Sequence, residues 1–386
     1  MGGHQVAARG GIHLTARAAP DGAGALPGAA ARPLAGLRIL DLTRLLPGPL
    51  AARHLVEWGA EVIKVDEPGV GDPARHMLKS ADDGASGRDS AFYREVNRGK
   101  TERRLDLRSP AGRDALLDLV ASSDALMEGF RPGVMDRLGL GWDVLHARQP
   151  RLVMVSVSGY GQRGGYAQRA GHDINYLALS GVLSQAGLSA GDDGDGALAL
   201  SNFQVADLLG GTLSATSALL AALLGAARTG QGQHLDISMT REVWRHAVIA
   251  RAEGRALSAA TGRVPGPGQA LLNGGAACYG LYRCADGRHL AVGALEPKFW
   301  QAFCQAIGQP GWTSRHWSAG ERPGSSAARA TRTDLATLLA TRASADWLAL
   351  TDPADCCVTP VLRLDEVPDH AWFDGDPGPA SPSDAS

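Results

Sequence analysis

Residues 37–66 read LRILDLTRLLPGPLAARHLVEWGAEVIKVD and contain two apolar runs separated by a helical pattern. Residues 37–42 and 61–66 are rich in Leu, Ile and Val, as buried strands are. Residues 47–58 predict a helix, because Pro47 stands near its start and Gly59 directly after its end. The stretch therefore predicts a βαβ unit, whose two strands lie parallel in one sheet.

The alternation of strands and helices continues downstream. Helices are expected at residues 111–122 and 208–227, and strands at 125–127, 151–158 and 234–239. Chains with this alternation form parallel sheets covered by helices. The predicted fold class is therefore α/β, with a Rossmann-like large domain.

A second, smaller domain is expected after a charged helix at about residues 241–255 and a Gly/Pro-rich linker at 262–275. It should be α+β, with strands near 278–283 and 289–294 and helices near 298–307 and 333–340. An acidic surface loop is expected at 187–196. We predict four parts: a disordered extension over residues 1–36, the large domain over 37–245, the linker and small domain over 246–362, and a shortened tail over 363–386.

Composition narrows the class of protein. The 386 residues carry a formal net charge of −2, which gives no electrostatic reason to expect nucleic acid or an anionic membrane as a partner. The apolar run at 208–227 contains Gly, Ser and Thr residues, which favour a buried helix of a soluble protein over a membrane span. The five cysteines, two of them adjacent, suit neither a disulfide framework nor a zinc site, so we expect a cytoplasmic protein.

The strongest candidate for chemistry is GHDINY, residues 171–176, in which His172 and Asp173 stand side by side. Asp207 precedes another apolar helix downstream. Two such groups that open different helices can face one carbon atom from two sides, as proton transfer at a stereocentre requires. The alternative is that each Asp caps a helix and that His172 is an ordinary loop residue.

Residues 159–164, GYGQRG, match the dinucleotide-binding pattern GxGxxG. That fingerprint needs a helix that opens at the last glycine and an acidic residue at the end of a second strand about 20 residues later. Here the region about 20 residues later is the helical run 177–182. We therefore predict a loop and no NAD site.

Three blocks resemble the signature segments of α-methylacyl-CoA racemases, which belong to the family III CoA-transferase superfamily. They are EGFRPGV at residues 128–134 with RLGLG at 137–141, GHDINY at 171–176, and LEP at 295–297. The similarity runs from about Leu34 to about Leu362, with the blocks in the same order. It implies the fold of that superfamily, an interlocked homodimer, an acyl-CoA substrate and a place in lipid or fatty acid metabolism.

The resemblance also implies roles for single residues. His172 and Asp207 would be the catalytic acid/base pair, and Glu296 would reach from the small domain to orient His172. The acyl-CoA-binding set would be Gly129, Phe130, Arg131, Arg137, Gly171, Asp173, Ile174, Asn175 and Tyr176. No metal and no redox cofactor is implied, because the thioester itself acidifies the substrate.

The basic stretch 97–104, NRGKTERR, is expected to be either a solvated face or a site for the nucleotide and phosphates of CoA. Relatives often carry a basic residue where Thr101 stands, and racemases can carry Arg where Glu67 stands. The residues that bind the adenosine end of CoA are left open.

Rival functions follow from the same residues. A family III CoA-transferase would use a single Asp to form acyl-anhydride intermediates, and Asp173 lies where that nucleophile would align. The presence of His172 before it, and of Asp207, favours the racemase. Relatives typically continue beyond the C-terminal end of this chain, which motivates a third possibility, a non-catalytic CoA-binding or partner-binding protein. The acyl group is left open between a sterol or bile-acid side chain, a branched fatty acid and an aromatic propionate.

Overall fold

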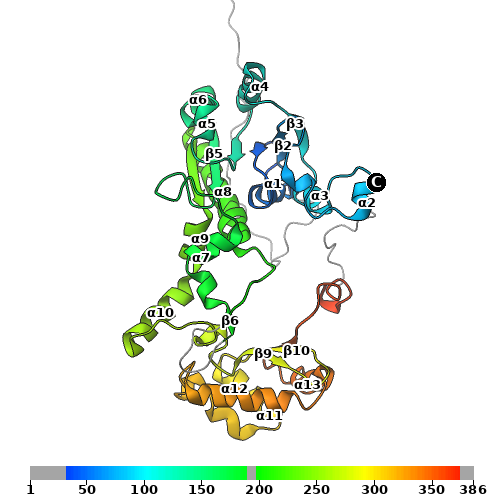
Figure 1. Cartoon of the computed structure of the whole chain (residues 1–386), viewed down its shortest axis with the longest axis vertical. Coiled ribbons are helices and arrows are strands. Elements are labelled where there is room, and N and C mark those ends of the chain that lie inside the picture. Colours follow the sequence, from blue (N-terminus) through cyan, green and yellow to red (C-terminus); the bar gives the residue numbers. More distant parts are fainter. Residues whose placement is uncertain (1–31, 189–196, 374–386) are drawn as a thin grey trace, which may run out of the picture. The chain divides into compact units, whose positions relative to one another are not determined.

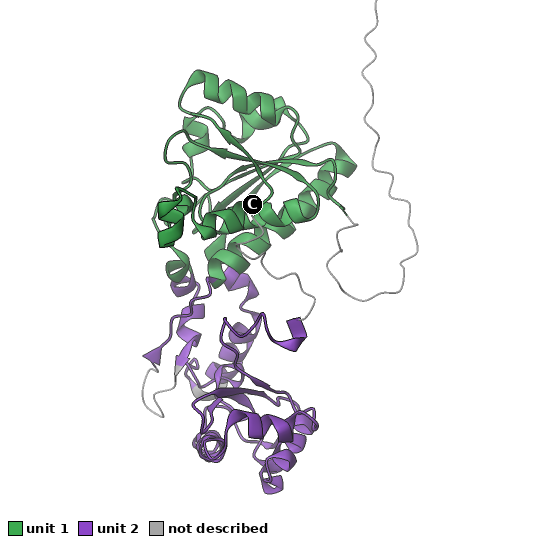
Figure 2. Cartoon of the chain, turned by 90° about the vertical axis from the view of Figure 1, so that its right-hand side faces the viewer, with its two compact units in different colours: residues 1–176, 205–242 green, residues 177–204, 243–386 purple. Residues whose placement is uncertain are grey.

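The computed structural model describes residues 32–188 and 197–373. Contacts divide the chain into two compact units, coloured separately in Figure 2. The first comprises residues 1–176 and 205–242, and the second comprises 177–204 and 243–386. Nearly all of the predicted N-terminal extension, most of the acidic loop at 187–196 and about half of the C-terminal tail lie outside the described residues.

The first unit is built on a six-stranded sheet in which every neighbouring pair is parallel. The strand order is β3-β2-β1-β4-β5-β8, which has the pattern of a Rossmann sheet. The strands are β1 (Arg38–Leu42), β2 (Glu61–Asp66), β3 (Thr101–Arg104), β4 (Ala125–Glu128), β5 (Val153–Ser158) and β8 (Gln233–Ser238). The predicted α/β fold with a parallel, Rossmann-like sheet is therefore confirmed.

Helices cover both faces of this sheet, as Figure 2 shows. One face is covered by α1 (Pro47–Glu57), by the π-helical segment η3 (Ala206–Leu213) and by α8 (Ser214–Thr229). The opposite face holds a hydrophobic cluster in which α4 (Pro110–Val120) and α6 (Trp142–Arg148) contribute Leu116, Val120 and Leu145. Side chains alternate between faces along a strand, so Leu126 and Glu128 of β4 lie on the same side as this cluster. The remaining helices of the unit are α2 (Ala81–Ala85), α3 (Ala91–Asn97) and α5 (Val134–Arg137), while α7 (Asp173–Leu179) and α9 (Met239–His246) begin in this unit and end in the second.

The predicted βαβ unit forms as expected. Pro47 is the first residue of α1, where its missing N–H costs nothing, and Gly59 ends the turn after the helix with a φ of +95°. Ile39, Leu40 and Leu42 are almost completely buried. The loop that joins β1 to α1 therefore starts at the carboxyl edge of the sheet, where ligands of open α/β sheets bind.

Two long helices differ from the sequence-based expectation. The helix expected at 208–227 begins as the π-helical segment η3, in which a side chain on Gly211 would clash with Pro47 at 2.6 Å. The helix expected at 241–255 is broken at Ala247, whose ψ of 45° is not helical, into α9 and α10 (Val248–Thr261). In the described part of the chain, residues 206–229 form one helix long and apolar enough by composition to span a membrane, and it packs against α1, β5 and β8.

The second unit has α+β character. Its antiparallel sheet has the order β11-β10-β9, formed by β9 (Tyr279–Arg283), β10 (His289–Gly293) and β11 (Val358–Pro360). The helices α11 (Pro297–Ala306), α12 (Ser326–Leu339) and α13 (Ser344–Thr351) pack on it, as Figure 1 shows. Trp300, Phe303 and Trp347 are the largest side chains of its core. A short hairpin, β6 (Gly187–Leu188) with β7 (Ala197–Leu198), also belongs to this unit.

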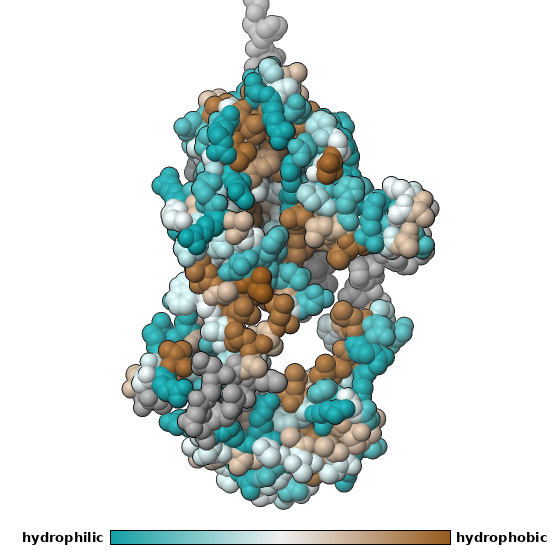
Figure 3. All heavy atoms as spheres, viewed as in Figure 1, coloured by the Kyte–Doolittle hydropathy of each residue, from teal (hydrophilic) through white to brown (hydrophobic). Residues whose placement is uncertain are grey.

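Both units expose large hydrophobic side chains, some of which form the brown areas of Figure 3. In the second unit, Leu364 and Trp372 are 89% and 78% exposed, and Val248, Ile249 and Leu281 are each at least 58% exposed. In the first unit, Leu213 and Leu224 are about half exposed.

Candidate active site

A cavity of about 450 Å³ opens at the carboxyl edge of the large sheet, within the first unit. Three loops that follow β1, β4 and β5 form much of its wall, including Thr43–Leu45, Gly129–Pro132 and Ser158–Tyr160. The residues before α7 and the first turn of η3 also line the cavity, with His172 and Asp207 among them. The structure therefore brings the two predicted catalytic residues to one cavity, His172 from the residue before α7 and Asp207 from the first turn of η3.

His172 directly precedes α7. Its N–H donates to Oδ1 of Asn175 at 3.0 Å, and its carbonyl accepts the N–H of Asn175 at 2.8 Å. This reciprocal pair fixes the backbone at the start of the helix, as a cap does. His172 is exposed and lines the cavity.

Asp173 has a different position from its neighbour. Its Oδ1 accepts the backbone N–H of Ala206 at 2.6 Å and that of Asp207 at 3.0 Å. Asp173 therefore fastens the start of α7 to the start of η3. His172 and Asp207 both line the cavity, whereas Asp173 is not part of its described lining.

The carboxyl of Asp207 is perturbed by its surroundings. Burial raises its pKa to about 7, and the negative charge of Asp173 raises it as well. A carboxyl with a pKa near 7 is populated in both its protonated and its ionised form at neutral pH. Asp207 can therefore act as an acid or as a base.

Tyr176 packs into the wall of the cavity between two glycines. A Cβ at Gly159 would lie 2.1 Å from its ring, and one at Gly171 would lie 2.7 Å from it. Its hydroxyl donates to the carbonyl of Gly171, and its ring contacts that of Tyr160 edge to face at 5.2 Å between centroids. Gly159 and Gly171 are therefore required by packing around Tyr176. Residues 159–164 form a loop, as predicted.

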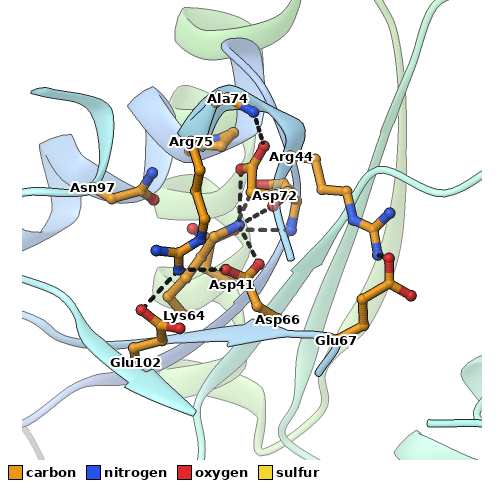
Figure 4. Close-up of polar contacts among 12 residues, drawn as sticks. Asp41, Arg44, Lys64, Asp66, Glu67, Asp72, Ala74, Arg75, Asn97 and Glu102 are labelled. Atoms are coloured by element: carbon orange, nitrogen blue, oxygen red, sulfur yellow. Dashed lines mark hydrogen bonds and ion pairs between the residues drawn. The ribbon is translucent and has the colours of Figure 1, made fainter. Parts of the chain in front are cut away.

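A buried ionic network, drawn in Figure 4, supports the Thr43–Leu45 wall from behind. Asp72 accepts the N–H of Leu45 at 3.1 Å, and Lys64 contacts the carbonyl of Thr43. Lys64 also lies 3.4 Å from both Asp66 and Asp72, and all three side chains are at most 1% exposed. Leu45 adopts a φ of +66°, which is unusual for a branched residue and is held by these contacts.

Lys100 belongs to the same network. Its Nζ donates to Asp41, to the carbonyl of Pro49 and to Asn97, each at 2.8 Å, and its side chain is 1% exposed. The following residues, Thr101–Arg104, form the edge strand β3. Lys100 thus has a structural role. The exposed cations of the basic stretch are Arg98, Arg103 and Arg104.

A second cavity, of about 720 Å³, lies on the α5–α6 face of the sheet. Arg131 lines both cavities, whereas Arg137 lines the second alone. Within the described residues, neither guanidinium forms an ion pair with a carboxylate. A ligand in the second cavity could therefore contact both arginines, whereas a ligand confined to the first cavity could contact Arg131 but not Arg137.

The other predicted site residues are distributed as follows. Gly129, Phe130, Gly171, Asn175 and Tyr176 line the first cavity. Ile174 is 43% exposed and is not part of that lining in the described structure. Glu296 belongs to the second unit, where it stands at the N-cap position of α11 without a capping hydrogen bond from its side chain, and Pro297 follows it. Its action on His172 stays a prediction.

Several lining residues escaped the sequence analysis, notably Arg44, Tyr160, Arg169 and Met239. Arg44 pairs with Glu67 at 3.3 Å and lies over the ring of Phe130. Its signal was its place directly after β1, at the edge of the sheet where ligands bind. Within the described ranges, no group of three or more His, Cys, Asp or Glu side chains could hold a metal ion.

Known proteins resemble this chain in sequence. Residues 34–376 match the model of the CoA-transferase family III. The chain is 36% identical to human alpha-methylacyl-CoA racemase over 338 residues, which are 87% of this chain and 80% of that protein. It is also 34% identical over 281 residues to succinyl-CoA–D-citramalate CoA-transferase of Chloroflexus aurantiacus, covering 72% of this chain and 66% of the relative.

Solved structures agree in fold. Rv3272 from Mycobacterium tuberculosis superposes with a TM-score of 0.71 at 28% identity, covering 89% of this chain and 87% of that one. A CAIB/BAIF family protein from Brucella suis gives a TM-score of 0.70 at 27% identity, covering 89% and 88% of the two chains. The parallel sheet, the cavity at its carboxyl edge and these matches lead to one conclusion: the chain belongs to the CoA-transferase family III.

Proposed function

We propose that this protein is a racemase that inverts the α-carbon of 2-methylacyl-CoA thioesters. The observation that carries the proposal is that His172 and Asp207 line one cavity, while the Asp173 carboxylate is engaged with the backbone of η3. The curated relatives include racemases that share more than a third of their aligned residues with this chain. They also include CoA-transferases, so the family match alone supports either reaction.

Inversion next to a thioester requires two proton transfers on opposite faces. One group, as a base, takes the proton from the α-carbon, and the electron pair of the C–H bond passes into the enolate. The other group, as an acid, gives a proton to the opposite face and restores the thioester. His172 and Asp207 supply the pair: an imidazole nitrogen can take up a proton as a base, and the pKa of Asp207, raised to about 7, leaves its carboxyl partly protonated at neutral pH.

The rival reaction, CoA transfer through an acyl-aspartyl anhydride, needs a carboxylate that reaches the thioester carbonyl. Asp173 is the candidate nucleophile, but one of its oxygens accepts two backbone N–H groups. Such hydrogen bonds stabilise a carboxylate and make it a weaker nucleophile. The position of Asp173 therefore favours a positioning role for it.

In the proposed complex, CoA lies along the Gly129–Arg131 turn, with Arg131 and Arg137 contacting its phosphates as charge-assisted donors. CoA is part of the substrate, and the reaction as proposed needs no further cofactor. We further propose that Glu296 orients His172, and that the protein acts as a homodimer in the cytoplasm.

The proposal is tested by incubating the protein with the separate enantiomers of a 2-methylacyl-CoA in deuterated water. A racemase incorporates deuterium at the α-carbon and yields both enantiomers from either one. A CoA-transferase instead moves CoA to an added carboxylate acceptor and leaves the α-hydrogen in place. Absence of deuterium across branched, sterol-type and aromatic acyl groups, with a folded protein, would reject the racemase.

A further inference from the structure

Glu128 is a buried acid that the proposed reaction does not use. It is the last residue of β4 and is 3% exposed. Its Oε2 accepts the N–H of Phe130 at 2.7 Å, and its side chain is hydrogen-bonded to the hydroxyl of Ser156 on the neighbouring strand. Phe130 lines the first cavity, whereas Glu128 and Ser156 line the second.

A chain of hydrogen bonds continues from Ser156. Its Oγ lies 2.8 Å from Nε2 of His234, which lies on β8 and also lines the second cavity. The ring of His234 stacks with that of Trp142 at 5.8 Å between centroids. His234, Ser156 and Glu128 thus form one connected path that ends on the backbone of the Phe130 turn.

We propose that Glu128 is a positioning residue of the CoA-binding cavity, and that its ionised carboxylate holds the Phe130 turn in the conformation that binds CoA. A charged oxygen accepts the Phe130 N–H more strongly than a neutral carboxyl does. Loss of the charge loosens the turn that presents Gly129, Phe130 and Arg131 to the ligand. Affinity for CoA therefore falls when Glu128 takes up a proton.

The hydroxyl of Ser156 has one proton to donate, so the state of Glu128 sets the direction of the whole chain. When Glu128 is ionised, Ser156 donates to it and accepts from Nε2–H of His234. When Glu128 is protonated, it donates to Ser156, which then donates to a bare Nε2, and the proton of the neutral imidazole lies on Nδ1. The tautomer of His234 therefore reports the charge of Glu128.

The groups around Glu128 bring its protonation into the physiological range of pH. Burial raises the pKa of Glu128 to about 7, while the hydrogen bonds from Ser156 and Phe130 oppose the rise. The negative charges of Asp236 on β8 and Asp136 on α5 raise it further. The other charged groups on this cavity are Arg131, Arg137, Asp143 and Arg163, and burial lowers the pKa of His234, which keeps that ring neutral.

The inference rests on the proposed binding of CoA, and it is tested by measuring the dissociation constant of CoA by calorimetry between pH 6 and 8.5. We expect wild-type affinity to rise about three- to tenfold with pH across this range, relative to Glu128→Gln. The amide of that variant can accept from Phe130 and donate to Ser156 but cannot ionise. Titration of CoA itself is common to both proteins and cancels in the comparison.

Three further variants separate Glu128 from its neighbours. Ser156→Ala removes a hydrogen bond that lowers the pKa of Glu128, so the affinity step should move to higher pH. Asp207→Asn and Asp143→Asn should keep the step, because neither residue contacts the Phe130 turn through a described hydrogen bond. Asp143→Asn is the matched control, since it removes a carboxylate from the same cavity.

Nitrogen-15 NMR of histidine-labelled protein gives an independent readout without CoA, with the His234 signal assigned by His234→Gln. We expect its tautomer to change from Nδ1–H to Nε2–H as pH rises, with the same midpoint as the affinity step, and to stay fixed in Glu128→Gln. A Glu128→Gln protein that keeps the affinity step, or a His234 tautomer that ignores Glu128, would overturn the inference. If the protein shows both the affinity step and the tautomer change but exchanges no α-hydrogen, this inference stands and the proposed racemase activity is rejected.

Discussion

Oδ1 of Asp173 lies 3.0 Å from the backbone nitrogen of Asp207, so one acid of the site holds the peptide of the other. The two carboxylates are thereby kept near each other, and the charge of Asp173 raises the pKa of Asp207. The carboxylate of Asp173 therefore has a structural and an electrostatic role that requires no covalent intermediate. It also means that Asp173 and Asp207 act on catalysis through each other, so their substitutions are not expected to be additive.

The raised pKa of Asp207 predicts a pH-dependent cost to stability. A carboxyl whose pKa is about 7 when folded and 3.8 when unfolded stabilises the fold fully below pH 3.8, and this contribution is lost as pH rises through 7. Asp207→Asn does not ionise and should escape the loss. Its free energy of unfolding should gain about 1–2 kcal/mol on wild type between pH 5 and 8.5, after allowance for partial exposure. Urea denaturation at the two pH values measures this gain. Asp143→Asn should show no such gain, and an equal gain in both variants would contradict the assignment.

The buried network behind the Thr43–Leu45 wall predicts a large structural cost. Lys100→Met leaves the carboxylate of Asp41, which is 0% exposed, without its 2.8 Å partner. Removing one partner of a buried ion pair typically costs about 3–5 kcal/mol. The exposed pair between Arg38 and Glu61, at 2.9 Å, is the control, and Arg38→Met should cost less than about 1 kcal/mol. Chemical denaturation of both variants checks the contrast, which equal losses would refute.

Replacing either arginine of the EGFRPGV and RLGLG blocks is expected to lower the affinity for CoA. Arg131→Ala and Arg137→Ala should each weaken binding of free CoA, by about 1.5–3 kcal/mol if each makes one charge-assisted hydrogen bond. Calorimetric titration measures the change. Arg148→Ala is the matched control, because Arg148 pairs with Asp118 at 3.3 Å on the surface, outside the described lining of both cavities. Unchanged affinity in both test variants would show that CoA does not bind at the Gly129–Arg131 turn.

The sequence was not sufficient for the edge strand β3 (Thr101–Arg104), whose residues are all polar. It predicted the other five strands of the sheet, because they carry apolar residues and alternate with helical segments. Leu37–Asp66 shows this most clearly, since periodicity, Pro47 and Gly59 all indicate the same elements. The prediction that His172 and Asp207 act together depended on resemblance, because local sequence patterns cannot relate two residues that are 35 positions apart.

Other features could not be read from local patterns. Lys64 and Asp66 are buried in the strand Glu61–Asp66, whose sequence does not show which opposite charges surround them; those partners come from the tertiary structure. Glu128 likewise reads as one letter of a motif, and its partners Ser156 and His234 come from two other strands. The break at Ala247 leaves the helical periodicity of the sequence intact, so a single helix was the natural prediction.

The division of labour between His172, Asp207 and Asp173 separates racemase from transferase most sharply. If His172 and Asp207 each serve one face of the α-carbon, His172→Ala should slow proton abstraction from one enantiomer and Asp207→Asn from the other. Each loss should be about 10²–10⁴-fold, as the loss of a general base is. Either variant can still exchange the hydrogen on the face that its remaining base reaches, but neither can invert the centre.

Asp173→Asn should affect abstraction less, because the amide oxygen can still accept the N–H groups of Ala206 and Asp207. Its loss of charge removes a cause of the raised pKa of Asp207, so the pH profile for the Asp207-dependent enantiomer should move to lower pH. A transferase requires the opposite pattern, in which Asp173 is indispensable and Asp207 is replaceable. Enantiomer-resolved deuterium exchange on the three variants decides between them, since normal inversion by Asp207→Asn together with an inactive Asp173→Asn is incompatible with a two-base racemase.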